Sequence, residues 1–149
     1  MIVAALLAVA LQTAPSGTPR SPEHQAVLTP VNAVFAALAA RDAAGLDSHF
    51  APSAQLTVVH ETADGANRIS QLGWQDFAGG LQPGPERFEE VLIDPTIAID
   101  GDIAVVWGSY VFRIDGQLSH CGVDHFGLVR KDGAWKITSL TWNQRDTGC

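Results

Sequence analysis

Two Asp-Gly pairs, each set between runs of β-branched and aromatic residues, constrain this chain more than any other feature. Asp115-Gly116 separates residues 103–114 from residues 117–130, and Asp132-Gly133 separates these from residues 134–145. Both residues of a two-residue hairpin turn take positive φ, which Asp-Gly tolerates well. The sequence therefore predicts three consecutive antiparallel strands joined by tight hairpins.

The two turns also predict which side chains share a face of this sheet. Continuing each ladder back from its turn places Trp107 opposite Asp124, and Asp124 opposite Thr141. The predicted inner face is apolar at one end and polar at the other, and carries Ile103, Trp107, His120, Asp124, Phe126, Leu128, Trp135, Ile137, Asn143 and Arg145. We expect a core that opens into a pocket. A slip of one residue in register would exchange the two faces.

The opposite face carries a second apolar set. Its members are Val106, Tyr110, Phe112, Val123, Leu140 and Trp142. This is more apolar surface than a small domain leaves exposed to water. We predict a homodimer through this outer sheet face, and coverage by the N-terminal segment or by the C-terminal tail is the alternative.

Length and charge limit the classes of partner. The chain has 149 residues, which suits one domain, and a formal net charge of −7 without a basic cluster. This charge argues against nucleic acid and against an anionic membrane surface as partners.

The first residues differ in character from the rest of the chain. Residues 2–11 form an unbroken apolar run that small and polar residues follow. The run is too short to span a bilayer and is typical of a signal peptide, with cleavage after Ala10 or after Ala14. We predict a signal peptide and short linker over residues 1–20, a single domain over 21–149, and export to the periplasm or the medium without later membrane attachment. A frayed hydrophobic terminus is the alternative, since no Lys or Arg precedes the run.

The chain has two cysteines, Cys121 and the final residue Cys149. In an oxidising compartment such a pair usually forms a disulfide. Closing a loop of this size stabilises a protein by about 3–4 kcal/mol in the chain-entropy model. Two free thiols are the alternative. No Cys-x-x-Cys or His-x-x-x-His spacing is present, so we predict no metal site, and we expect no cofactor.

Helices and strands are also predicted upstream of the hairpins. Ser21-Pro22 begins a helix whose apolar face is interrupted at Pro30, where the helix either kinks or restarts with Thr29 as its cap. The further predicted elements are a short helix from Asp42 to about Phe50, a strand over 55–60, a helix from Ser70 to Gly79-Gly80, and a long strand over 86–99 that is broken near Asp94-Pro95.

Helices followed by a long curved antiparallel sheet predict an α+β domain. The segment Phe50-Ala-Pro-Ser-Ala54, the helix with Trp74 and the motif Asp-Gly-x-Trp-x-Ile at 132–137 resemble the nuclear transport factor 2-like superfamily over about residues 25–149. Residues 99–107, residues 119–126 and the Thr-Gly-Cys ending look more closely like its "putative lumazine-binding", SnoaL-like branch. The resemblance implies a cone-shaped half-barrel, with the N-terminal helices packed on the concave sheet face around a hydrophobic pocket, commonly in a dimer.

Six residues are the candidate ligand-binding residues. Trp107, Trp74 and Phe126 could supply flat apolar walls, although aromatic residues in such places are more often core. Asp124 could act as an acid or as a hydrogen-bond donor, or could be a structural carboxylate. The remaining two are His120, which could also be an exposed rim histidine, and Asn143, which could orient a ligand amide. Glu90 could reach the pocket in one of two possible registers.

The sequence leaves three functions open. The first is an exported binder of a polar heteroaromatic, lumazine-like molecule. The second is a lyase, isomerase or hydrolase with Asp124, and with His120 as a second candidate, in acid-base roles. The third is a non-catalytic dimerisation module. Ketosteroid isomerases of the superfamily use a tyrosine and a protonated acid, but the only tyrosine, Tyr110, is expected on the outer face, so no catalytic residue is assigned.

Overall fold

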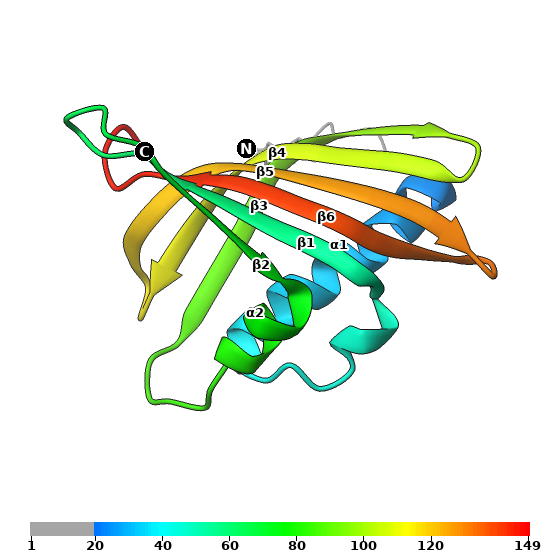
Figure 1. The fold of residues 1–149 in the computed structure, drawn as a ribbon, viewed down its shortest axis with the longest axis horizontal. Helices are drawn as coiled ribbons and strands as arrows, with labels where there is room; N and C mark the ends of the chain where they lie inside the picture. The colour runs from blue at the N-terminus through cyan, green and yellow to red at the C-terminus, as the bar shows by residue number, and fades with distance from the viewer. Residues whose placement is uncertain (1–19) are drawn as a thin grey trace, which may run out of the picture.

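Six strands form one curved sheet, and the helices lie on its concave side (Figure 1). The computed structural model describes residues 20–149, and the predicted signal peptide lies outside the described residues. The elements are α1 (Pro22–Ala40), the 3₁₀ helix η1 (Leu46–Ser48), β1 (Phe50–His60), β2 (Arg68–Gly73), α2 (Trp74–Gly80), β3 (Phe88–Asp100), β4 (Ile103–Ile114), β5 (Gln117–Lys131) and β6 (Ala134–Gln144). This is the predicted α+β half-barrel.

The strand order is β2-β1-β6-β5-β4-β3. All neighbouring strands are antiparallel except β1 and β6, which run parallel. The sheet is therefore mixed, whereas an antiparallel sheet was expected from the hairpins. Hairpin turns specify only the pairing of strands that follow one another directly in the sequence. Strands β1 and β6 are far apart in the sequence, so no hairpin turn determines how they pair.

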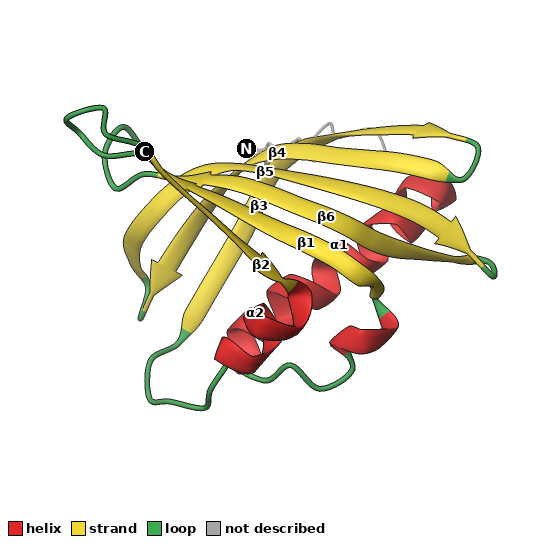
Figure 2. Cartoon of the chain, in the orientation of Figure 1, coloured by secondary structure: helices red, strands yellow, loops and turns green. Residues whose placement is uncertain are grey.

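Helix α1 begins as predicted and covers the concave face (Figure 2). The Ser21 hydroxyl accepts a hydrogen bond from the backbone N–H of His24 at 3.2 Å, which caps the first turn. The helix continues through Pro30, and the Thr29 hydroxyl donates to the Gln25 carbonyl instead of starting a new helix. Buried valines on one side of α1, Val27, Val31 and Val34, pack into the core.

Among residues 20–149, no helix is long and apolar enough to cross a bilayer.

Two predicted helices are wrong in extent. The segment after Asp42 forms only the short η1, and the chain is already a strand at Phe50. Ser70 does not cap a helix, because it lies in β2 and pairs with Val58 of β1. Strand pairing satisfies the backbone groups of this segment, and it overrides the local preference of serine for a helix start.

Both predicted hairpins are confirmed. Asp115 and Gly116 have φ of 51° and 80°, and Asp132 and Gly133 have φ of 52° and 78°. Ile114 pairs with Gln117 across the first turn, and Lys131 pairs with Ala134 across the second. The predicted break in β3 is also present, as a register shift between Ile93 and Thr96.

Two β-bulges change the register within these hairpins. On β5, Leu118 pairs with Arg113 and His120 pairs with Phe112, which leaves Ser119 as an extra residue. On β6, Thr138 is the extra residue between Ile137, which pairs with Leu128, and Ser139, which pairs with Gly127. Each bulge turns the following side chains to the other face, so the register counted from the turns is correct only near the turns.

The predicted faces of β4 and of the second half of β6 are therefore wrong. Trp107 pairs with His125 and lies on the convex face, where it is 55% exposed. The concave face instead carries buried residues that had been assigned to the outside, namely Val106, Tyr110, Phe112 and Leu140. Asn143 lies on the convex side, and the inward assignment of Asp124, Phe126 and Leu128 on β5 is correct.

The predicted disulfide joins Cys121 of β5 to Cys149, with 5.7 Å between the two Cα atoms. The C-terminal tail folds back because Cys121 and Arg145 also exchange two backbone hydrogen bonds, of 2.9 and 3.0 Å. The bond ties the chain end to the sheet near the β1–β2 loop.

Replacing Cys149 by Ser should lower the free energy of unfolding by about 3 kcal/mol, because the bond closes a loop across 28 residues. Chemical denaturation with and without reductant measures this difference. Reductant should destabilise the wild type by a similar amount and leave the Cys149→Ser variant unchanged. Equal stability of the two proteins under oxidising conditions would contradict the contribution assigned to the bond.

Candidate functional site

A cavity lies between α1 and the concave face of the sheet, and we call it the inner cavity. Its volume is about 190 Å³. Its walls are mainly apolar and aromatic, and its lining residues are Val34, Phe35, Leu38, Phe77, Glu90, Tyr110, Phe112, His120, Asp124, Leu140, Trp142 and Gln144. A mostly apolar cavity with a few polar groups is the usual form of a small-molecule site.

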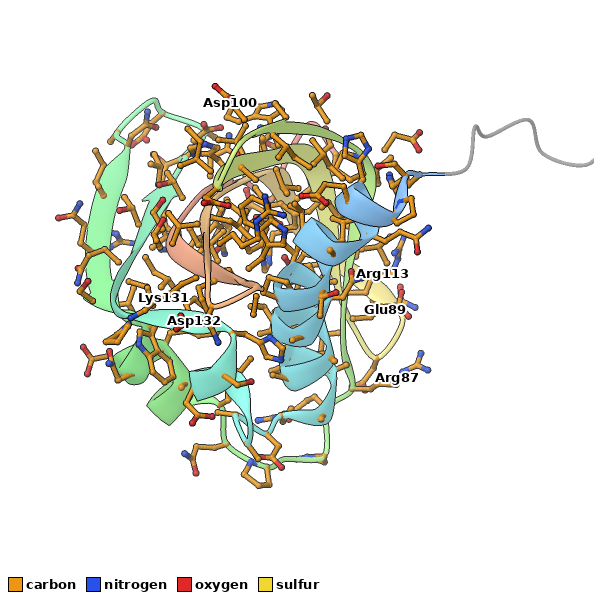
Figure 3. All side chains as sticks on the ribbon, turned by 90° about the vertical axis from the view of Figure 1, so that its right-hand side faces the viewer. Arg87, Glu89, Asp100, Arg113, Lys131 and Asp132 are labelled. Atoms are coloured by element: carbon orange, nitrogen blue, oxygen red, sulfur yellow. A yellow bond between two sulfur atoms is a disulfide. The ribbon has the colours of Figure 1, made fainter. Side chains whose placement is uncertain are left out.

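Two carboxyl groups meet in this apolar cavity. Asp124 comes from β5, pairs with Gly108 of β4 and is only 3% exposed. Glu90 comes from β3, where side chains alternate between the two faces. Its neighbour Glu89 contacts Arg113 at 3.5 Å on the outside, and Figure 3 shows these two side chains together at the surface. Glu90 therefore points inward, where its side chain shares a hydrogen bond with Asp124.

Burial controls the protonation of both carboxyl groups. Loss of water raises the pKa of Asp124 to about 7, and the hydrogen bond from Glu90 opposes part of this effect. The pKa of Glu90 is raised well above its ordinary value by burial first, and then by the charge of Asp124 and by the hydrogen bond between them. Two neighbouring buried carboxyl groups disfavour double ionisation, so the pair retains a proton on Glu90 when Asp124 ionises.

Tyr110 lies beside the carboxyl pair but its hydroxyl is already engaged. The hydroxyl donates to the backbone carbonyl of Asn143 at 3.0 Å. Burial raises the pKa of Tyr110, and the charges of Asp124 and Glu90 add to this effect. Gly122 pairs with Tyr110, and a Cβ atom at this position would clash with the backbone carbonyl oxygen of Asn143 and lie 2.8 Å from the tyrosine ring, so glycine is needed where Tyr110 reaches Asn143.

The inner cavity borders a second, polar depression near the chain end, which we call the rim hollow. His120 and Gln144 line both spaces. The rim hollow is further lined by His60, Glu61, Arg68, Arg145 and Asp146, among others. Burial, followed by the charge of His60, lowers the pKa of His120. The His120 ring stacks on Phe112 with 4.7 Å between centroids, so a neutral imidazole marks this end of the inner cavity.

Comparisons with known proteins agree with this architecture. The family model described as "Putative lumazine-binding" matches residues 22–143, which is most of the chain. The chain belongs to this family. No functionally curated protein matches the chain.

Solved structures show the same fold as this chain. A nuclear transport factor 2-like protein of Shewanella baltica is 17% identical, with a TM-score of 0.62, and the match covers 88% of this chain and 100% of that one. One from Cytophaga hutchinsonii is 14% identical, with a TM-score of 0.66, and the match covers 84% and 100%. A protein of Nostoc punctiforme with a cystatin-like fold is 11% identical, with a TM-score of 0.66, and the match covers 86% of this chain and 95% of that one. The family and the fold support a small-molecule-binding protein.

The structure brings only two of the six candidate residues, Asp124 and His120, to the inner cavity. Trp107 lies on the convex face. Asn143 is held by its neighbours, since its Oδ1 accepts from the Val123 N–H at 2.7 Å and its Nδ2 donates to Glu61 at 2.8 Å.

The other two candidates are core residues. Trp74 stacks on Phe50 with 5.3 Å between centroids, and Phe126 is fully buried. Neither side chain lines the inner cavity.

The cavity residues that the sequence placed on the wrong face are Tyr110, Phe112 and Trp142. A uniform register without the two bulges puts all three side chains on the convex face. The sequence allows two registers for Glu90, and the structure has the inward one, since Glu89 and Val91 alternate with it and face outward. Within residues 20–149, no cluster of His, Cys, Asp and Glu has a geometry that could hold a metal ion.

Asp124→Asn should reduce the pH dependence of stability. The folded state holds a proton on Asp124 that the unfolded chain releases near its ordinary pKa of 3.8. Raising the pH from about 4 to about 7 therefore favours unfolding of the wild type, and this contribution is constant above that range. Between about pH 4 and about pH 8, the free energy of unfolding should fall by about 3 kcal/mol less in Asp124→Asn than in the wild type.

Urea denaturation at a series of pH values measures this difference. The exposed Asp47, replaced by Asn, is the matched control and should follow the wild type. Parallel pH profiles for the wild type and Asp124→Asn would contradict a raised pKa at Asp124.

Proposed function

We propose that this protein is an exported binding protein whose inner cavity holds a flat heteroaromatic molecule of lumazine type. The observation that carries the proposal is an aromatic cavity that contains the paired carboxyls of Glu90 and Asp124. The apolar walls favour a ring system, and the carboxyls favour a ring with polar atoms at its edge. The family description agrees with this ligand class.

The size of the inner cavity supports a ring ligand. A dry apolar cavity of about 150 Å³ in another protein binds benzene, and the inner cavity measures about 190 Å³. Phe35, Phe112 and Trp142 line it from α1, β4 and β6, so aromatic surface meets the ligand from several sides. Trp142, and not Trp107, is the tryptophan that lines the cavity and can stack on a ligand ring.

The proposal of export rests on two observations. The Cys121–Cys149 disulfide suits an oxidising compartment. Residues 2–11 have the composition of a signal peptide, with residues 1–20 as signal and linker before the domain at 21–149. The periplasm and the external medium both meet this requirement.

Tryptophan fluorescence tests the binding site. Titration of the mature protein with ribityllumazine, riboflavin and a pterin should give saturable quenching with at least one of them. Replacing Trp142 by Phe should remove most of the quenching, because Trp142 lines the inner cavity. Replacing the exposed Trp107 by Phe is the matched control and should leave the ligand-dependent change in place.

Two results would count against this site. The first is quenching that disappears with Trp107→Phe and persists with Trp142→Phe, which would place the ligand on the convex face. The second is the lack of a saturable response to any of the three molecules.

An enzyme is the second candidate function, and the raised pKa of Asp124 favours it. A carboxyl group with a pKa of about 7 can both give and take a proton near neutral pH. A lyase, isomerase or hydrolase would use Asp124 as its acid or base, with His120 at the end of the cavity. A pH–rate profile that follows one carboxyl group and vanishes in Asp124→Asn separates this candidate from simple binding.

A non-catalytic dimerisation module whose pocket is filled by its own side chains is less well supported. That hypothesis expects no space near Asp124, whereas the inner cavity borders this residue.

Dimerisation itself remains part of the proposal, with a different set of residues. The convex face of β3 and β4 exposes large apolar side chains, namely Val91, Ile93, Ile103, Val105 and Trp107. A second copy of the chain would remove this surface from water.

Replacing Trp107 by Glu should convert a dimer into a monomer, because the charge would be buried at the centre of the proposed contact. Sedimentation equilibrium measures the change. Ile69→Glu is the control, since Ile69 is 67% exposed on β2 at the opposite edge of the sheet. A wild type that is monomeric at high concentration would overturn the dimer.

A further inference from the structure

Asp124 has an unsatisfied oxygen. Its Oδ2 atom is buried, and among the described residues no N–H group and no hydroxyl group donates to it. A buried acceptor without a partner costs folding free energy, so such atoms usually have a functional or solvent partner. The Glu90 carboxyl shares a hydrogen bond with Asp124, and it can do so only while it carries a proton.

The other polar side chains near the pair are engaged or lie farther along the inner cavity. The Tyr110 hydroxyl donates to the Asn143 carbonyl. The His120 ring contacts the Ser119 hydroxyl at 3.2 Å and stacks on Phe112. Gln144 lies with His120 where the inner cavity borders the rim hollow. The residues that α1 and α2 contribute, Val34, Phe35, Leu38 and Phe77, are all apolar.

A carboxyl pair with one proton therefore presents one donor and one acceptor side by side. We propose that Glu90 and Asp124 recognise the cis-amide edge of a heteroaromatic ring, with the Glu90 O–H donating to the ring carbonyl and Asp124 Oδ2 accepting from the neighbouring ring N–H. The ligand then replaces the single hydrogen bond between the carboxyls by two, and both carboxyls remain satisfied.

This recognition specifies a ligand class more narrowly than the proposed function, on which it rests. Pteridine-diones and other lactams or imides have an N–H next to a C=O within one ring. Aromatic molecules without an amide N–H leave Asp124 unsatisfied, and molecules with an anionic edge meet a second negative charge. A site built to hydrogen-bond a polar edge discriminates strongly against analogues that lack it.

Isothermal titration of the full mature chain with two molecules tests the inference. One is pteridine-2,4-dione, and the other is its 1,3-dimethyl form, which has the same rings and carbonyls but no amide N–H. The wild type should bind the dione roughly 10–100-fold more tightly, the range for leaving one buried acceptor unpaired. Asp124→Asn keeps an acceptor oxygen and should preserve the preference, whereas Asp124→Val should reduce it to a few-fold.

Glu90 is tested by a second pair of variants. Glu90→Gln keeps an N–H donor and should bind the dione within a few-fold of the wild type. Glu90→Met has a similar length without a donor and should bind it roughly tenfold more weakly. Thermal unfolding of each variant confirms that it is folded under the conditions of the titration.

The outcomes separate the inference from the proposed function. Equal binding of the dione and its dimethyl form to the wild type overturns cis-amide recognition and leaves the binding function intact. A preference that survives in Asp124→Val also overturns it, because the N–H would then be recognised elsewhere. Failure of both molecules to bind the wild type overturns the proposed ligand class together with this inference.

Discussion

The two β-bulges at Ser119 and Thr138 are the constraint on which the inner cavity depends. Each bulge adds one residue to a strand and reverses the faces of the residues beyond it. Together they bring Tyr110 and Trp142 onto the concave face beside Asp124. A sheet without these bulges would present Trp107, Asp124 and Thr141 there instead. The inner cavity would then lack Tyr110 and Trp142 from its walls.

The placement of α1 completes the site and fixes its electrostatics. The helix contributes only apolar side chains to the inner cavity, while β3 and β5 contribute the two carboxyl groups. Because the walls exclude water, the two carboxyls cannot both ionise at low cost. The same burial that lowers stability at neutral pH keeps a proton on the carboxyl pair. Such buried polar groups reduce stability, as is common where polar groups are preorganised.

Sequence patterns predicted the local elements that depend on a few neighbouring residues. Ser21-Pro22 begins α1, the two Asp-Gly pairs form tight turns, and the break at Asp94-Pro95 appears as a shift in β3. Predictions failed where pairing with a distant strand decided the outcome. Ser70 has a strong preference for helix starts, yet it lies in β2 because β1 supplies its backbone partners.

The sequence by itself determined the hairpins, the first helix, the family resemblance and the presence of an acid at position 124 that faces inward. Turn geometry, capping and composition are local properties, and these features depend on them. Tertiary structure decided which residues surround that acid, because one extra residue in a strand turns every later side chain to the other face. The alternation of apolar and polar residues in β4 and β6 does not reveal where such an extra residue lies. The partnership of Glu90 with Asp124 likewise exists only after β3, β4 and β5 curve around α1 and bring the two carboxyls together.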